Sequence, residues 1–169
     1  MSVLAKYLTL DAVRVDVEVT SRKRLFEEAA LAIEAAYGEP HDEVFNALFE
    51  RERLGSTGLG CGCAVPHGRL ADVSEPAMVL LRAKNPVDYD APDGLPVTLA
   101  MAIIVPEENP EAHLALLRET AALFSEASMR TALCQAPAAV DICRLIAQWQ
   151  SPLSDEAPQE TPGEPAPEH

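Results

Sequence analysis

The chain has 169 residues, of which 48% are hydrophobic and 5% aromatic, and its net charge is −14. A chain of this length buries a continuous apolar core without disulfides or metals, and we expect one domain over residues 1–150. The acidic balance excludes a nucleic-acid-binding surface, since no basic stripe offsets the repulsion of phosphates. Residues 151–169 hold five acids, five of the fourteen prolines and no Lys or Arg, which predicts an acidic, Pro-rich, disordered tail.

No segment predicts a signal peptide or a membrane span. Lys6 and Asp11 interrupt any apolar stretch near the start, and the longest apolar run, residues 99–105, is too short to cross a bilayer. The four cysteines are therefore interpreted as reduced thiols and not as disulfides. These features favour a cytoplasmic protein without membrane insertion.

The first expected elements in chain order are one strand and two helices. Residues 12–19 alternate between Val and other residues, which predicts a half-buried strand. Thr20 or Ser21 can cap the helix that is predicted over residues 22–37. A second amphipathic helix is expected over residues 41–54, and it leads directly into a glycine-rich segment.

Strands and helices then follow in an irregular order. Strands are expected over residues 62–67, 77–83, 87–89 and 97–105, and helices over residues 110–127, 128–135 and 138–149. We expect Asn109 to cap the first of these helices, with Pro110 at its first position. Val140, Leu145 and Trp149 are the expected core contacts of the last helix. This order predicts an α/β fold, a mixed β-sheet flanked by helices on both faces.

The glycine-rich segment, GSTGLGCGCAVPHG at residues 55–68, contains five glycines, which let backbone N–H groups converge on an anion. It lacks the Lys-Ser/Thr pair of a Walker A loop and the G-x-S-x-G spacing of a nucleophile elbow. A plain turn is one alternative to a phosphate loop. A metal site on Cys61, Cys63 and His67 is another, although this C-x-C-x3-H spacing departs from the usual zinc patterns.

Two histidines and an arginine raise the prospect of anion chemistry. His67 follows Pro66 at the exit of a predicted strand, where a neutral imidazole can act as a nucleophile or as a metal ligand. His113 falls near the start of a helix, whose dipole favours a nearby anion; a packed core histidine is the alternative. Arg51 precedes the glycine loop and can pair with phosphate oxygens, or be a solvated member of the ERER charge run. Together, these residues favour an anion site.

The segment RERLGSTGLGCGCAVPHGRL and the segment HLALL, which begins 46 residues after His67, carry a family resemblance. They resemble the enzyme IIA component of the bacterial phosphoenolpyruvate:sugar phosphotransferase system, in its fructose/mannitol type. The resemblance extends from about Val3 to Trp149. Within this family, the chain is most similar to the free-standing nitrogen-regulatory enzymes IIA, because PHG is followed by a basic residue, Arg69.

The resemblance implies the mannitol-type enzyme IIA fold and a set of site residues. His67, in the PH motif, matches the histidine that carries the phosphoryl group on Nε2. His113 matches the second active-site histidine, which helps to hold the phosphate, and Arg51 matches the arginine before the glycine turn. The implied partners are an HPr-type phosphocarrier protein as donor and regulatory target proteins. The chain is thus expected to be a phosphocarrier that signals through its phosphorylation state, and not a small-molecule enzyme.

The GSTG turn is expected to supply the phosphate-binding groups, namely the hydroxyls of Ser56 and Thr57 and the backbone N–H groups around Gly58. No metal or other cofactor is expected. Two alternatives stay open. One is a sugar-specific enzyme IIA that passes its phosphate to a transporter domain, and the other is a metal or redox sensor that uses Cys61 and Cys63.

Overall fold

The computed structural model describes residues 2–153, and the predicted tail lies outside this range from residue 154 on. Ser151 is only 1% exposed, so packed structure continues slightly beyond the predicted domain limit at residue 150. Within residues 2–153, none of the helices is both long enough and apolar enough to cross a membrane.

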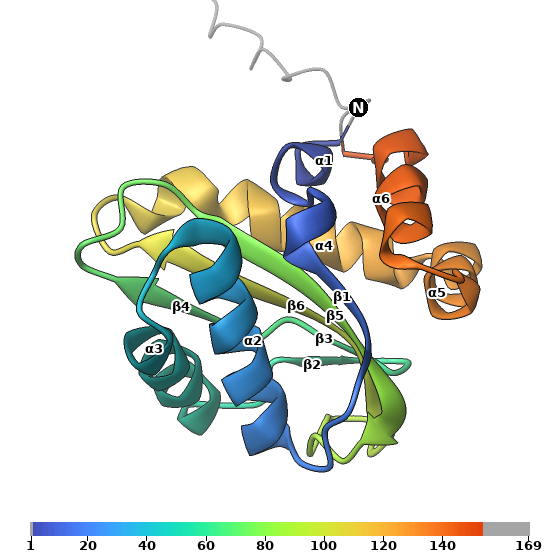
Figure 1. The fold of residues 1–169 in the computed structure, drawn as a ribbon, viewed down its shortest axis with the longest axis horizontal. Helices are drawn as coiled ribbons and strands as arrows, with labels where there is room; N and C mark the ends of the chain where they lie inside the picture. Colours follow the sequence, from blue (N-terminus) through green and yellow to red (C-terminus); the bar gives the residue numbers. More distant parts are fainter. Residues whose placement is uncertain (1, 154–169) are drawn as a thin grey trace, which may run out of the picture.

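One mixed β-sheet runs through the fold (Figure 1). Its strands are β1 Val13–Val17, β2 Gly58–Gly60, β3 Cys63–Ala64, β4 His67–Leu70, β5 Ala77–Val87 and β6 Val97–Pro106. β5 and β6 pair antiparallel at the centre, and β1 lies parallel to β5. On the other edge of β6, β3 and β4 pair parallel to it one after the other, and β2 pairs antiparallel with β3.

Helices cover both faces of this sheet. They are α1 Leu4–Tyr7, α2 Arg22–Tyr37, α3 His41–Arg53, α4 Leu114–Ser125, α5 Ala127–Gln135 and α6 Ala139–Gln148, with the short 3-10 helices η1 Leu10–Ala12 and η2 Pro110–His113. In Figure 1, α2 and α3 lie in front of the sheet and α4 lies behind it. The prediction of an α/β fold with a mixed sheet and helices on both faces is confirmed.

The early elements follow the sequence signals closely. The Ser21 hydroxyl accepts a hydrogen bond from the Arg24 N–H at 3.1 Å, which makes Ser21 the N-cap of α2. Gly38 ends this helix at a φ of 80°, a left-handed conformation that glycine adopts without strain. β6 is buried along most of its length, as its continuous apolar sequence predicts for a central strand.

The prediction of a separate strand over residues 87–89 is wrong. β5 continues without interruption to Val87, and the chain then leaves the sheet. The Tyr89 side chain, which is 0% exposed, points into the core instead of extending a strand. The segment is therefore a loop in which Tyr89 is buried while Asp88 and Asp90 are exposed, and this loop lies against the glycine-rich segment.

Asn109 takes the N-cap position and Pro110 begins the helix, as predicted, but this helix is the short 3-10 helix η2 and Asn109 does not cap it with its side chain. Asn109 has a φ of 57°, in the left-handed region that Asn tolerates better than most residues, and its side chain makes no capping hydrogen bond. The chain then forms the short helix η2 before α4 begins at Leu114. As a result, His113 lies at the junction of the two helices and not inside the first turn of one continuous helix.

One predicted core contact of the last helix does not form. Val140 is 49% exposed, whereas Trp149 is buried and Leu145 packs partly against the core. Ile142 and Ile146 supply the fully buried positions. These two residues are four apart and share one helix face, and Val140 lies on a different face.

Two residues near the end of the glycine-rich segment fix the position of β4. Pro66 has no N–H to donate, and the parallel pairing with β6 stops at Ala64 and resumes at His67, opposite Ile103. Gly68 allows α3 to approach closely, because a Cβ atom there would lie 2.7 Å from the carbonyl oxygen of Ala47. The strand that begins with His67 is therefore packed directly against α3.

Candidate functional site

His67 is the first residue of β4, and its ring is held by the backbone just before it. Its Nδ1 atom lies 2.8 Å from the carbonyl oxygen of Val65. A carbonyl oxygen only accepts hydrogen bonds, so Nδ1 carries the proton and donates it. The neutral ring then has its lone pair on Nε2, which makes Nε2 the nucleophilic atom.

The surroundings of His67 favour the neutral ring. Burial lowers the pKa of His67 below its ordinary value of 6.5, and the cations Arg51 and Arg69 lower it further. The hydrogen bond to Val65 and the charge of Glu52 act in the opposite direction and raise the pKa, but the net shift is downward. At neutral pH the imidazole of His67 is therefore uncharged and able to act as a nucleophile.

A groove of about 860 Å³ opens beside His67, between α3, β4, η2 and the start of α4. Arg51 and His113 line this groove with His67, so the structure brings together the three residues that the sequence singled out. Leu54, which is 85% exposed, and Leu114, which is 42% exposed, also line it. The groove thus combines a nucleophile, a cation and a second imidazole with exposed apolar side chains.

A second, smaller hollow of about 220 Å³ reaches His67 from the glycine turn. Arg51 and His67 line both hollows, and Ser56, Thr57 and Gly58 line only the smaller one. The smaller hollow has room for a group the size of a phosphate, whereas the larger groove has room for part of another protein. His67 lies where the two meet.

The hydrogen bonds of the turn show which donors of Ser56, Thr57 and Gly58, the three predicted phosphate-binding residues, are already used within the protein. The Ser56 hydroxyl oxygen accepts from the Gly58 N–H at 3.1 Å, which leaves the hydroxyl proton of Ser56 able to donate. Thr57 is different, because both its N–H and its hydroxyl donate to the carboxylate of Glu52. In this conformation Thr57 has no donor left for a ligand. Arg51 donates to the Gly55 carbonyl oxygen at 2.9 Å and so spans the start of the turn.

Residues 6–149 match the family described as phosphoenolpyruvate-dependent sugar phosphotransferase system, EIIA 2. The chain belongs to this EIIA 2 family.

Individual relatives agree with this assignment. The chain is 38% identical over 149 residues to the nitrogen regulatory protein of Pseudomonas aeruginosa, an alignment that covers 88% of this chain and 97% of the relative. The crystal structure of the nitrogen regulatory protein IIA-Ntr of Neisseria meningitidis superposes with a TM-score of 0.81 and 43% identity, covering 86% of this chain and 99% of that one. IIA mannitol of Escherichia coli has the same fold, with a TM-score of 0.69 and 21% identity over 82% of this chain and 98% of that one.

Sequence reasoning missed two buried polar residues of this EIIA 2 domain. Glu52 belongs to the ERER run, for which a solvated charge is one sequence-based interpretation, yet it is only 6% exposed. Its position relative to Val44 and Leu48 was the available signal, because these three residues recur every four positions and share the buried face of α3. Tyr89 gave no comparable signal, because its hydroxyl meets Thr57 across 32 residues of sequence.

Cys61 and Cys63, the candidate metal ligands of the glycine-rich segment, lie in different surroundings, one exposed and one buried. Within residues 2–153, no group of three His, Cys, Asp or Glu side chains is arranged to hold a metal ion. Burial raises the pKa of the Cys63 thiol to about 12, so this thiol stays protonated and is a poor metal ligand or redox nucleophile. Cys61 is exposed at a φ of 55°, and its N–H donates to the Asp93 carboxylate at 2.8 Å. Cys61 lies in the turn between β2 and β3, and Cys63 is the first residue of β3.

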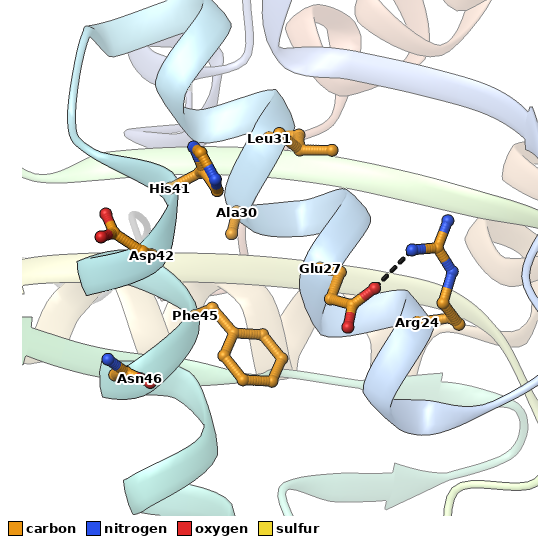
Figure 2. A pocket seen from close by; sticks show the side chains of 8 residues that line it. All are labelled: Arg24, Glu27, Ala30, Leu31, His41, Asp42, Phe45 and Asn46. Atoms are coloured by element: carbon orange, nitrogen blue, oxygen red, sulfur yellow. Dashed lines mark hydrogen bonds and ion pairs between the residues drawn. The ribbon is translucent and has the colours of Figure 1, made fainter.

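A further groove lies between α2 and α3, and Figure 2 shows its lining from both helices. It contains His41, whose Nδ1 atom lies 2.8 Å from the Glu34 carboxylate and whose side chain is 53% exposed. Phe45 and Leu31 supply its apolar surface, and Arg24 pairs with Glu27 at its edge. The groove is separate from the glycine turn, and the residues that line it include neither His67 nor Arg51.

Proposed function

We propose that this EIIA 2 domain is a regulatory phosphocarrier that accepts a phosphoryl group on Nε2 of His67 from an HPr-type carrier protein. The observation that carries the proposal is the ring of His67, which is neutral, has Nδ1 bonded to the Val65 carbonyl, and meets two hollows lined by Arg51. The relatives of higher identity are named nitrogen regulatory proteins, which favours a regulatory role in the cytoplasm over sugar transport.

The transfer needs no separate base. The Nε2 lone pair of His67 attacks the phosphorus of the donor phosphohistidine, and the P–N bond of the donor breaks. The electron pair of that bond returns to the donor ring, which carries a proton on its other nitrogen and therefore leaves as neutral imidazole. His67 keeps its Nδ1 proton, and the positive charge that develops on its ring is stabilised by the Val65 carbonyl oxygen.

The surrounding groups stabilise the transferred phosphoryl oxygens. Phosphoryl transfer has a loose transition state, so positioning and charge compensation account for most of the catalysis. Arg51 supplies a fixed cation, the Ser56 hydroxyl supplies a donor, and His113 faces the same groove from the end of η2. These three groups approach His67 from different elements and can surround the phosphoryl group.

The larger groove is suited to the donor protein. Leu54 and Leu114 offer exposed apolar surface beside His67, and the acidic net charge of the chain attracts a carrier with a basic rim. Exposed apolar side chains beside a reactive group are typical of a surface that docks another protein.

The proposal is tested by incubating the protein with an HPr-type carrier charged with radioactive phosphate and mapping the modified residue by mass spectrometry. We expect one acid-labile phosphate per chain, located on His67, and none in His67→Ala. His41→Ala is the matched control, since it removes an exposed histidine outside the site and should be phosphorylated like the parent. Acid-labile phosphate on His67→Ala would contradict the assignment. A pull-down with phosphorylated and unphosphorylated protein then identifies partners that distinguish the two states.

A further inference from the structure

Glu52 is the buried carboxylate closest in sequence to the candidate site. It occupies the last turn of α3, next to Arg51, with its side chain 2% exposed. Burying a carboxylate is costly unless hydrogen bonds and a cation compensate the lost hydration. The hydrogen-bond partners of Glu52 therefore show which segments of the chain its buried carboxylate fixes in position.

Three of its hydrogen bonds come from a single residue of the glycine turn. The Thr57 N–H lies 3.2 Å from each carboxylate oxygen, and the Thr57 hydroxyl donates to Oε2 at 2.5 Å. Arg22, from the start of α2, donates to Oε1 at 3.3 Å and supplies the compensating cation. Both donors of Thr57 are thereby fixed on Glu52.

The loop after β5 completes the arrangement from the opposite side. The Tyr89 hydroxyl lies 2.7 Å from the Thr57 hydroxyl oxygen, and the Tyr89 carbonyl accepts from Arg22 at 3.0 Å. Gly58 lies so close to Ala91 that a Cβ on Gly58 would be 2.7 Å from the Ala91 Cβ. The glycine turn is therefore held between α3 and this loop.

We propose that Glu52 is a positioning residue for phosphoryl transfer, an inference that rests on the proposed function. It does not contact the phosphoryl group. By binding both donors of Thr57, it fixes the turn so that the Ser56 hydroxyl and the Arg51 guanidinium border the small hollow beside His67. Its function is to hold the donors of the turn in place before the phosphate arrives, so that they do not reorganise during transfer.

Glu52 also acts on His67 through its charge. The charges of Arg51 and Glu52 on α3 and of Arg69 on β4 act on His67, and His113, Glu43 and Glu50 line the groove with it. Glu52 is the anion that opposes the two arginines and raises the pKa of His67. Replacing Glu52 by an uncharged residue should therefore move the titration of His67 to lower pH, an effect that a purely structural role would not produce.

The first test compares Glu52→Gln with the parent for transfer from a charged HPr-type carrier. We expect the rate at saturating carrier to fall at least tenfold, with a KM for the carrier that stays within twofold and with phosphate still on His67. Glu119→Gln is the matched control, because Glu119 is also buried, at 8% exposed, but accepts from Ser2 at 3.3 Å outside the site. A folded Glu52→Gln protein with a rate within twofold of the parent would overturn the inference.

A second pair of variants applies if Glu52→Gln does not fold. Thr57→Val removes the hydroxyl bound to Glu52, and Thr57→Ser retains it. Slow transfer in Thr57→Val with recovery in Thr57→Ser supports the inference, and equal rates in both overturn it.

NMR titration of the His67 ring separates this inference from the proposed function, since it needs no phosphate donor. A titration midpoint that moves to lower pH in Glu52→Gln supports the coupling, and an unchanged midpoint contradicts it. A parent protein that takes up no phosphate on His67 refutes the proposed function itself, whatever the titration shows.

Discussion

Helix α3 borders two grooves, and each contains a histidine in a different environment. His67 lies in the groove beside β4, where its ring is partly buried and its Nδ1 atom donates to a backbone carbonyl. His41 lies in the groove between α2 and α3 (Figure 2). Its ring is exposed to solvent and is paired with the Glu34 carboxylate. The Val65 carbonyl holds the His67 ring through its Nδ1 atom and leaves the Nε2 lone pair free, whereas the Nδ1 atom of His41 is held by a carboxylate at the protein surface.

The two grooves also differ in what surrounds the histidine. Beside His67, Arg51 and His113 come from separate elements and face a common space next to the glycine turn. Beside His41, the nearby charges pair with one another along α2, as Arg24 does with Glu27 and Glu28. The two histidines thus differ in the donors that share a hollow with the ring, and exposure of the ring, which is greater for His41, does not supply such donors.

The largest effect that tests this comparison is expected from Arg51→Ala. Loss of a positioned cation should slow phosphate transfer to His67 by about 100-fold or more, the range found when one donor to a developing charge is removed. Arg53→Ala is the control, since Arg53 is exposed two residues away and pairs with Glu50 at 3.1 Å. The measurement is the transfer rate at saturating carrier. A rate within twofold of the parent would remove Arg51 from the mechanism.

A smaller loss is expected from His113→Ala. A hydrogen bond to a charged group contributes about 1.5–3 kcal/mol, so transfer should slow by about 10- to 100-fold while the phosphate remains on His67. Mass spectrometry of the phosphorylated variant checks the site, and single-turnover kinetics give the rate. Unchanged kinetics would confine His113 to a packing role in the groove.

Much of the fold could be predicted from local sequence signals. Alternating Val residues indicated β1, and Ser21 and Gly38 marked the ends of α2, because hydrophobic periodicity and helix capping depend on residues close in sequence. The error at Tyr89 has a different origin. Tyr89 leaves the sheet because its side chain packs against Phe26, 63 residues earlier, and no local pattern encodes that contact.

The candidate site was predictable only in part, for the same reason. His67, His113 and Arg51 stand in recognisable motifs, and the structure places all three on one groove, while their chemical roles stay predictions. Glu52 was missed because the partners that make its burial possible, Arg22 and Tyr89, lie 30 and 37 residues away. The spacing from Val44 and Leu48 places Glu52 on the buried face of α3, but the partners that compensate its charge become visible only in the folded structure.

A pH titration sharpens the contrast at His67. Because the pKa of His67 is lowered in the folded protein, the transfer rate should stay constant as the pH falls to 6.5, the ordinary pKa of histidine, and should decline only at lower pH.

The stability of the protein should also depend on the protonation of His67. The unfolded chain binds a proton near pH 6.5 before the folded protein does, so the contribution of His67 is present above this pH and is lost as pH falls through the lower folded value. His67→Gln should remove this part of the pH dependence in thermal unfolding, and a dependence that persists unchanged would contradict the shift.

The smallest effect is expected at the other groove. His41 lowers the pKa of Glu34 through its backbone N–H, at 2.6 Å, and through its ring, and Glu34 lies at the protein surface. The contribution of Glu34 to stability is therefore present above its ordinary pKa of 4.5 and is lost as pH falls through the lowered value. Glu34→Gln should reduce the Tm slightly at pH 7, this difference should shrink as the pH falls below 4.5, and phosphate transfer to His67 should match the parent. Slower transfer in this variant would mean that the groove between α2 and α3 contributes to docking the carrier, and the two grooves would then act together on one partner.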